Sequence, residues 1–151
     1  MEPGYWDHNT HYHRWLLGVV PPAVGTAVDV GCGDGLLLQR LAPRCRRVVG
    51  LEPDPATAAR ASARTVGLAH VQVEQVGLLD WEAPDGSVDV VCAVASLHHL
   101  DLAAAVSRAA RLLRPGGVLP GSVFRRRLLW RYTAVWRTSE GGSRAQRSVA
   151  R

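Results

Sequence analysis

The chain has 151 residues, of which 47% are hydrophobic, so it is long enough for one domain with a core and too short for two. No apolar run approaches the roughly 18 residues needed to cross a bilayer, and the N-terminus lacks the apolar stretch of a secretory signal. The three cysteines form no C-x-x-C pair, so neither a disulfide framework nor a zinc site is expected. These observations favour a cytoplasmic protein with reduced thiols.

The positive charge is concentrated towards one end of the chain. All eighteen basic residues are arginine, and the formal net charge is +5. Residues 1–119 hold ten arginines against twelve acids, whereas residues 120–151 hold eight arginines against Glu140. The net charge therefore belongs to the C-terminal segment and does not by itself indicate nucleic-acid binding.

Residues 1–20 are rich in aromatic residues and histidine, and Pro21-Pro22 ends any helix that they form. His8, His11 and His13 lack partners at a recognisable metal-ligand spacing, so we expect no metal site. An amphipathic lid over a ligand pocket and ordinary core packing both suit this segment.

From Thr26 onward, short β-branched runs alternate with helical patterns. Pro55 suits the first turn of a helix, and Asp101 is a good N-cap. We predict strands over residues 26–30, 47–51, 71–76 and 88–93, and helices over residues 36–42, 55–66 and 102–113. Continuous apolar strands that alternate with helices predict an α/β fold with a doubly wound, mostly parallel sheet.

The pattern changes near the C-terminus. Residues 114–117, R-P-G-G, end the last helix and lead into another strand. Residues 120–137 form a basic terminal strand region that fits one long strand or a short helix and a strand. Residues 138–151 are polar and glycine-containing, which predicts a disordered tail after a single domain over residues 1–137.

Three glycines, Gly31, Gly33 and Gly35, lie between the first strand and the helix after it. Such glycines let the backbone approach a ligand, and the helix start offers free N–H groups. A dinucleotide site prefers G-x-G-x-x-G, whereas the spacing here is G-x-G-x-G. The flanking carboxylates of Asp29 and Asp34 would repel a pyrophosphate and suit an ammonium or sulfonium, which favours S-adenosylmethionine (SAM).

Glu52 ends the second strand, where a carboxylate can accept hydrogen bonds from both hydroxyls of a ribose. An acid at this position suits NAD equally well, so Glu52 alone does not discriminate between the two cofactors.

Four segments in this order and spacing resemble class I SAM-dependent methyltransferases of the small-molecule, type 11-like kind. They are V-D-V-G-C-G-D-G at 28–35, V-V-G-L-E-P-D at 48–54, D-V-V-C-A-V-A-S-L-H-H-L at 89–100 and L-L-R-P-G-G-V-L at 112–119. The resemblance covers residues 5–119. It implies a Rossmann-like fold, SAM as the cofactor, and an enzyme that transfers a methyl group to a small-molecule acceptor.

The resemblance also implies residue roles. Gly31, Cys32 and Gly33 would lie against the methionine part and ribose of SAM. Asp29 would orient the loop and the ligand's amino group, and Glu52 would hold the ribose hydroxyls.

Further contacts are implied next to these. Pro53 would pack on the adenine, and the backbone near Val94 would meet the methionine end. The family often has an aspartate after the third strand, but Gly77 stands there in this chain. The backbone of Leu78 or the side chain of Asp80 would then receive the adenine amino group.

His98 and His99 follow the fourth predicted strand, at the edge of the sheet where doubly wound folds bind ligands. Either could act as a general base for an acceptor hydroxyl. Both could instead simply begin the next connection, so they are weak catalytic candidates.

A full domain of this family continues past R-P-G-G with a helix and two antiparallel strands, but only 32 residues follow Leu119 here. Residues 124–136 resemble the C-terminal strand region of that family. We therefore predict that the C-terminal strands and helix are partly missing, which would affect the acceptor pocket more than SAM binding.

Three alternatives follow from the same residues. A SAM-binding remnant or regulatory module fits the shortened C-terminal half. An NAD(P)-dependent reductase is disfavoured by the glycine spacing and by the absence of lysine. RNA binding through Arg125, Arg126 and Arg127 is disfavoured because a charged run is more commonly a solvated face.

Overall fold

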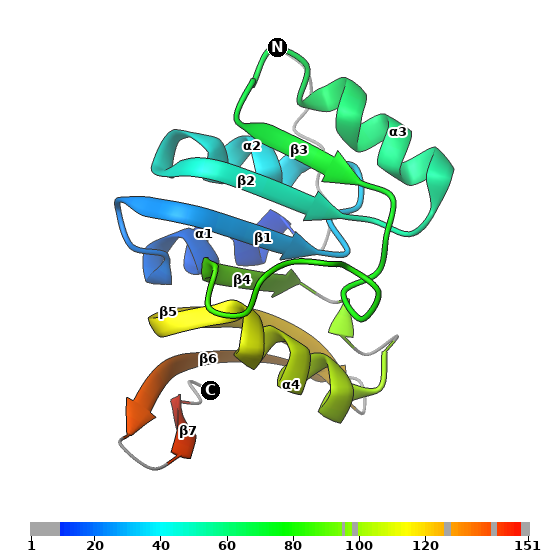
Figure 1. Cartoon of the computed structure of the whole chain (residues 1–151). Helices are drawn as coiled ribbons and strands as arrows, with labels where there is room; N and C mark the ends of the chain where they lie inside the picture. Colours follow the sequence, from blue (N-terminus) through cyan, green and yellow to red (C-terminus); the bar gives the residue numbers. More distant parts are fainter. Residues whose placement is uncertain (1–9, 95, 98–99, 126–127, 140–141, 149–151) are drawn as a thin grey trace.

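The computed structural model describes residues 10–94, 96–97, 100–125, 128–139 and 142–148. A 7-stranded sheet has the order β3-β2-β1-β4-β5-β6-β7 (Figure 1). The elements are α1 (Thr10–Val19), β1 (Val24–Val30), α2 (Leu36–Leu41), the 3-10 turn η1 (Ala42–Arg44), β2 (Cys45–Leu51), α3 (Pro55–Arg64), β3 (Val71–Glu74), β4 (Val88–Val94), α4 (Leu102–Leu112), β5 (Leu113–Arg125), β6 (Leu128–Ser139) and β7 (Gly142–Ser148).

Strands β1 to β5 are all parallel. Strand β1 pairs with both β2 and β4, while β3 and β5 lie outside them. This arrangement confirms the predicted doubly wound α/β sheet. All five strands end at the same edge, so the loops after β1, β2 and β4 meet there.

Helices cover both faces of this sheet. Successive side chains of a strand point to opposite faces, so Ala27 packs in the cluster that contains α2, whereas Val28 packs in the cluster that contains α4. Figure 1 shows α1 and α2 behind the strands and α4 in front of them. Between β3 and β4, buried Leu78 and Trp81 cover the α4 face from a connecting loop.

Two helices begin at aspartates, of which the sequence indicates Asp101; for the other helix it indicates Pro55 in the first turn. Asp54 accepts a hydrogen bond from the Thr57 amide at 2.7 Å, with Pro55 next in the helix. Hydrogen bonding from the side chain and the amide of Thr57 also lowers the pKa of the Asp54 carboxyl. Asp101 accepts from the Ala104 amide at 2.9 Å, which confirms it as the N-cap of α4. Each cap satisfies an amide that the helix itself leaves unpaired.

The R-P-G-G segment lies within the bounds of β5 rather than before it. Val88 pairs with Leu113 and Val90 pairs with Val118, so the register between β4 and β5 shifts across this segment. Gly116 has a φ of 82°, which permits the local bend.

The C-terminal segment adds two antiparallel strands. β6 pairs with β5, and β7 pairs with β6. No helix occurs among the described residues after Leu112. Strand β7, Gly142–Ser148, lies within the segment for which composition predicts a disordered tail, and its backbone pairs with the edge of β6.

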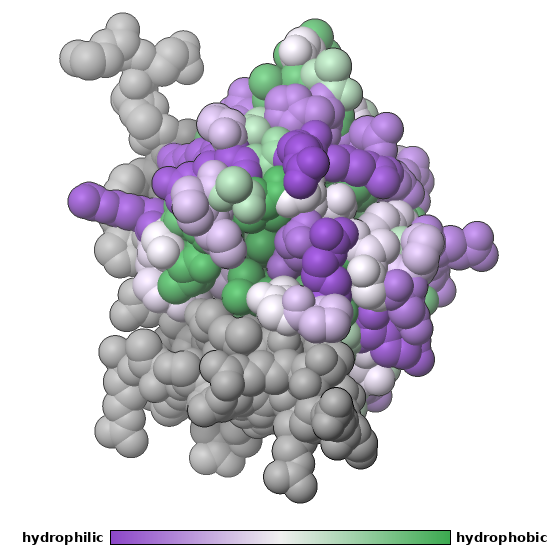
Figure 2. Space-filling view, turned by 60° about the vertical axis from the view of Figure 1, so that its left-hand side comes forward, coloured by the Kyte–Doolittle hydropathy of each residue, from purple (hydrophilic) through white to green (hydrophobic). Residues whose placement is uncertain are grey.

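Figure 2 brings forward the side of the molecule on which the parallel strands begin. Hydrophobic residues gather near the centre of the described surface there, with hydrophilic residues around them. Within the described part of the chain, no helix is both long and apolar enough to cross a membrane.

Candidate functional site

A cavity of about 830 Å³ lies beside the glycine loop, at the edge where β1 and β4 end. It is bounded by α1, the loop after β1, the start of α2, one face of α3 and the end of β4. Its lining residues are His13, Asp29, Gly31, Cys32, Gly33, Asp34, Leu36, Leu37, Gln39, Thr57, Arg60, Arg64 and Val94.

The glycine loop passes very close to its neighbours. Gly31 has a φ of 67°, and a Cβ at this position would lie 2.6 Å from the Cβ of Ser96. Gly35 has a φ of 85°, and its Cβ would lie 3.0 Å from the Cα of Ala61 in α3. The loop therefore depends on glycine both for its backbone conformation and for the space it occupies.

Gly31→Ala should lower the free energy of unfolding by more than about 1 kcal/mol, because it adds left-handed strain to a steric overlap. Thermal or denaturant unfolding would measure this loss. Gly67→Ala is the matched control, because Gly67 also has a positive φ, of 87°, but a Cβ there meets nothing within 4 Å. Equal losses in the two variants would contradict the close approach to Ser96.

Asp29 is a buried acid at the cavity, with 2% of its surface exposed. Burial raises the pKa of its carboxyl to about 8, and the nearby negative charge of Glu52 contributes further. A positively charged ligand group beside Asp29 would favour the carboxylate over the acid form.

Glu52 connects the glycine loop to the start of α3. One carboxylate oxygen accepts a hydrogen bond from the Gly33 amide at 3.1 Å, and the other accepts from the Asp54 amide at 3.0 Å. The amides of Gly31 and Cys32 donate to the carbonyl of Leu51, at 2.8 and 3.0 Å. The end of β2 therefore holds the loop that follows β1.

The structure brings only some of the predicted site residues to the cavity. Asp29, Gly31, Cys32, Gly33 and Val94 line it, but Glu52, Pro53 and Leu78 are not among the lining residues.

The region after β3 offers no clear side chain for adenine. The Leu78 side chain is buried in the core on the α4 face. Asp80 is exposed, its amide donates to the Gly77 carbonyl at 3.2 Å, and its carboxylate lies 3.9 Å from a Cβ built on Gly77. Asp80 therefore has the geometry of a turn residue next to Gly77.

Several cavity residues were not identified from the sequence as site residues. Thr57, Arg60 and Arg64 come from one face of α3, and His13 comes from α1. Polar residues at intervals of three and four on an alanine-rich helix are the signal that would have pointed to this face.

Other predictions can be located only in part. His98, His99, Arg126 and Arg127 lie outside the described residues, and so do Tyr5 and Trp6, two aromatic residues of the N-terminal segment for which a lid was one expectation. The helix α1 reaches the cavity through His13, whereas Tyr12 is not among the lining residues.

Cys32, Cys45 and Cys92 are free and buried. Burial raises the pKa of all three thiols, that of Cys45 to about 11. Buried thiols of this kind are poor nucleophiles. In the described part of the chain, no three His, Cys, Asp or Glu side chains are grouped so that they could hold a metal ion.

A glycine loop, an acid after β2 and a cavity at the carboxyl edge of a parallel sheet define a Rossmann-like nucleotide-binding fold. A family model described as a methyltransferase domain matches residues 28–120. The chain belongs to this methyltransferase family.

Individual relatives agree with the family. An uncharacterized methyltransferase of Mycobacterium tuberculosis is 37% identical over 115 residues, which cover 76% of this chain and 58% of the relative. The 27-O-demethylrifamycin SV methyltransferase of Amycolatopsis mediterranei is 34% identical over 133 residues, covering 79% and 49%.

A solved structure shows the same fold. It is geranyl diphosphate C-methyltransferase from Streptomyces coelicolor, solved in complex with Mg²⁺, geranyl diphosphate and S-adenosylhomocysteine. The two structures superpose with a TM-score of 0.71 at 26% sequence identity, and the match covers 76% of this chain and 44% of that chain. SAM is implied as the cofactor by the S-adenosylhomocysteine in this solved structure and by a 38% identical relative from Mycolicibacterium smegmatis that is named as a probable S-adenosylmethionine-dependent methyltransferase. The chain spans about half the length of the curated relatives that it matches.

Proposed function

We propose that this chain is a SAM-dependent methyltransferase that acts on a small-molecule acceptor. The observation that carries the proposal is the buried carboxyl of Asp29 beside the glycine loop, in a cavity of about 830 Å³. SAM carries both an ammonium and a sulfonium, and a buried carboxylate stabilises such charges.

The residues present fit this cofactor. Gly33 lines the cavity, and a Cβ there would meet nothing within 4 Å, so the loop leaves open space for a ligand at this point. Glu52 has both carboxylate oxygens directed to backbone amides, at 3.1 and 3.0 Å. The same oxygens are the acceptors that ribose hydroxyls would use.

SAM supplies an already activated methyl group when it is bound. The contribution of the chain is therefore chiefly to bind and orient. Asp29 would hold the cationic end, Glu52 would hold the ribose, and the apolar wall that includes Leu37 and Val94 would exclude water. A general base is needed only when the acceptor must lose a proton.

The names of two relatives support a small-molecule acceptor. One is named as a 27-O-demethylrifamycin SV methyltransferase, and another is a geranyl diphosphate C-methyltransferase solved with geranyl diphosphate. The molecules in these names, a demethylrifamycin and geranyl diphosphate, are both small organic compounds, and the named acceptor atom is oxygen in the first and carbon in the second.

Two measurements test the proposal. Calorimetric titration with SAM should show saturable binding at one site, and incubation with methyl-labelled SAM and a broad set of small molecules should show label transfer. Saturable NADH binding without SAM binding would contradict the proposed cofactor. SAM binding without transfer to any acceptor would indicate a binding module instead of an enzyme.

A further inference from the structure

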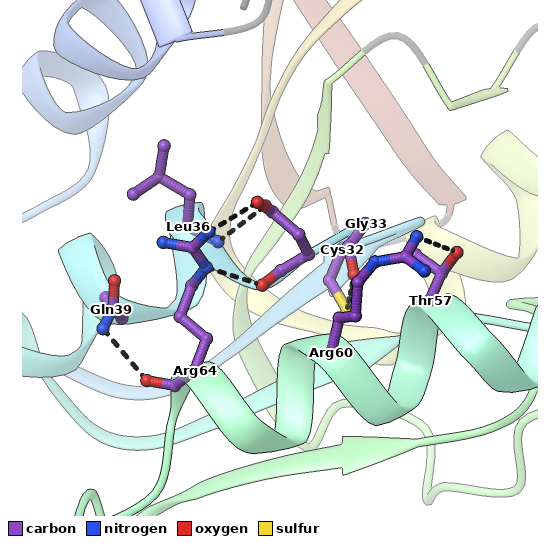
Figure 3. A network of polar contacts seen from close by, with 8 residues as sticks. Cys32, Gly33, Leu36, Gln39, Thr57, Arg60 and Arg64 are labelled. Atoms are coloured by element: carbon purple, nitrogen blue, oxygen red, sulfur yellow. Dashed lines mark hydrogen bonds and ion pairs between the residues drawn. The ribbon is translucent and has the colours of Figure 1, made fainter. Parts of the chain in front are cut away.

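Helix α3 holds the glycine loop at two separate points. At the start of the helix, Glu52 joins the amides of Gly33 and Asp54. At the end of the helix, the side chain of Arg64 reaches Asp34, one residue after Gly33. Figure 3 shows dashed lines from the guanidinium of Arg64 to this residue, which is drawn without a label. The second connection is not part of the implied SAM contacts.

Arg64 makes two hydrogen bonds to the same loop residue. Its Nε donates to the backbone carbonyl of Asp34 at 2.9 Å, and its Nη2 donates to the Asp34 carboxylate at 2.7 Å. The planar guanidinium suits such paired acceptors, whereas a lysine ammonium would offer only a point charge. The backbone and the side chain of Asp34 are therefore fixed together.

Asp34 in turn supports the start of α2. Its other carboxylate oxygen lies 3.4 Å from the amide of Leu36, while Gly35, the N-cap residue, has no side chain to cap the helix. The Arg64–Asp34 pair therefore fixes the loop at the point where it becomes a helix.

Two more contacts bring α2 and α3 together here. The Gln39 side-chain amide donates to the carbonyl of Arg64 at 3.0 Å (Figure 3). Ala61 leaves no room for a Cβ on Gly35. The contacts of Arg64 therefore form part of a packed junction between the helices that flank the cavity.

We infer that Arg64 is a positioning residue for cofactor binding, which holds the glycine loop in its binding conformation through Asp34. The inference rests on the proposed function. Three loop glycines, Gly31, Gly33 and Gly35, have positive φ and would be free to adopt many other conformations. Fixing them before binding reduces the entropy that a ligand must overcome.

The test is calorimetric titration of SAM into the folded wild-type chain and four variants, Arg64→Met, Arg64→Lys, Asp34→Asn and the double variant Arg64→Met/Asp34→Asn. Arg64→Met should raise the Kd for SAM about fivefold to tenfold. The pair is about one third exposed, which limits the effect. Arg64→Lys should recover part of the affinity.

The double variant separates positioning from general packing. If Arg64 acts through Asp34, the double variant should bind SAM about as weakly as Arg64→Met, because the second change removes a contact that is already lost. Arg47→Met is the matched control, because it removes an exposed arginine that joins two elements elsewhere, through a hydrogen bond from Arg47 in β2 to Gln72 in β3 at 2.9 Å. Its SAM affinity should equal that of the wild type.

Thermal unfolding of each variant shows that the titrations are made on folded protein. A lower Tm in Arg64→Met with an unchanged Kd would overturn the inference and leave the proposed function intact. Fully additive effects of Arg64→Met and Asp34→Asn would also overturn it. No SAM binding by the wild type would overturn the proposed function, and this inference with it.

Discussion

SAM should bind this chain about tenfold more weakly for each unit by which the pH falls below about 8, because the pKa of Asp29 is raised to about 8. Below that pH the Asp29 carboxyl is protonated in the free chain. A cationic ligand group favours the carboxylate, so binding must release the proton. The affinity for SAM therefore rises with pH up to about 8. Above that pH the Asp29 carboxyl is already ionised in the free chain, so its titration raises the affinity no further.

Titrations at pH 6.5 in two buffers of different ionisation enthalpy would measure the protons released on binding. We expect close to one proton for the wild type and none for Asp29→Asn. The ligand's own amine is still protonated at this pH, so it contributes little. Binding by the wild type without proton release would contradict a direct interaction between Asp29 and the cationic end of SAM.

The same pKa affects stability. The folded chain binds the Asp29 proton more tightly than the unfolded chain, whose pKa is near the ordinary 3.8. The stability that this group contributes is therefore complete below about pH 4 and is lost as the pH rises through about 8. Asp29→Asn should gain stability relative to the wild type between pH 5 and pH 9, by on the order of a few kcal/mol.

Glu52→Ala should reduce the affinity for SAM by about 30-fold to 100-fold, the largest loss expected from one side chain. The change removes the proposed ribose acceptor and also the only side chain in the described structure that accepts from the amides of Gly33 and Asp54. The loop after β1 and the start of α3 would then lose their connection.

Glu52→Gln is the informative intermediate, because it keeps the shape and one acceptor oxygen. We expect a smaller loss than for Glu52→Ala, measured by calorimetry with SAM. Glu82→Gln, at an exposed position away from this cavity, is the matched control and should bind like the wild type. An affinity for Glu52→Ala within twofold of the wild type would show that the ribose is bound by other residues.

Much of the fold could be predicted from the sequence because its signals are local. The Asp101 cap, the first-turn position of Pro55 and the apolar runs of the parallel strands depend on neighbouring residues alone. The α/β alternation then places the ends of β1, β2 and β4 at one edge of the sheet. For this reason Asp29, Gly31 and Val94 could be expected near one another before the structure was known.

The C-terminal strands show where local signals fail. Residues 120–137 carried no clear period, and the structure divides them between the end of β5 and most of β6, whose conformation depends on pairing with each other. Residues 142–148 are polar and glycine-containing, so composition predicted disorder. Their strand conformation comes from backbone pairing with β6, which composition does not report.

By itself, the sequence determined the glycine loop, the acid after β2 and the family, because these features depend on residue type and spacing along the chain. Only the tertiary structure decided that Arg64 reaches Asp34, which lies thirty residues earlier in the chain, because that contact requires α2 and α3 to be packed together. The raised pKa of Asp29 also depends on the tertiary structure, because the burial that causes it is produced by all the residues packed around the carboxyl.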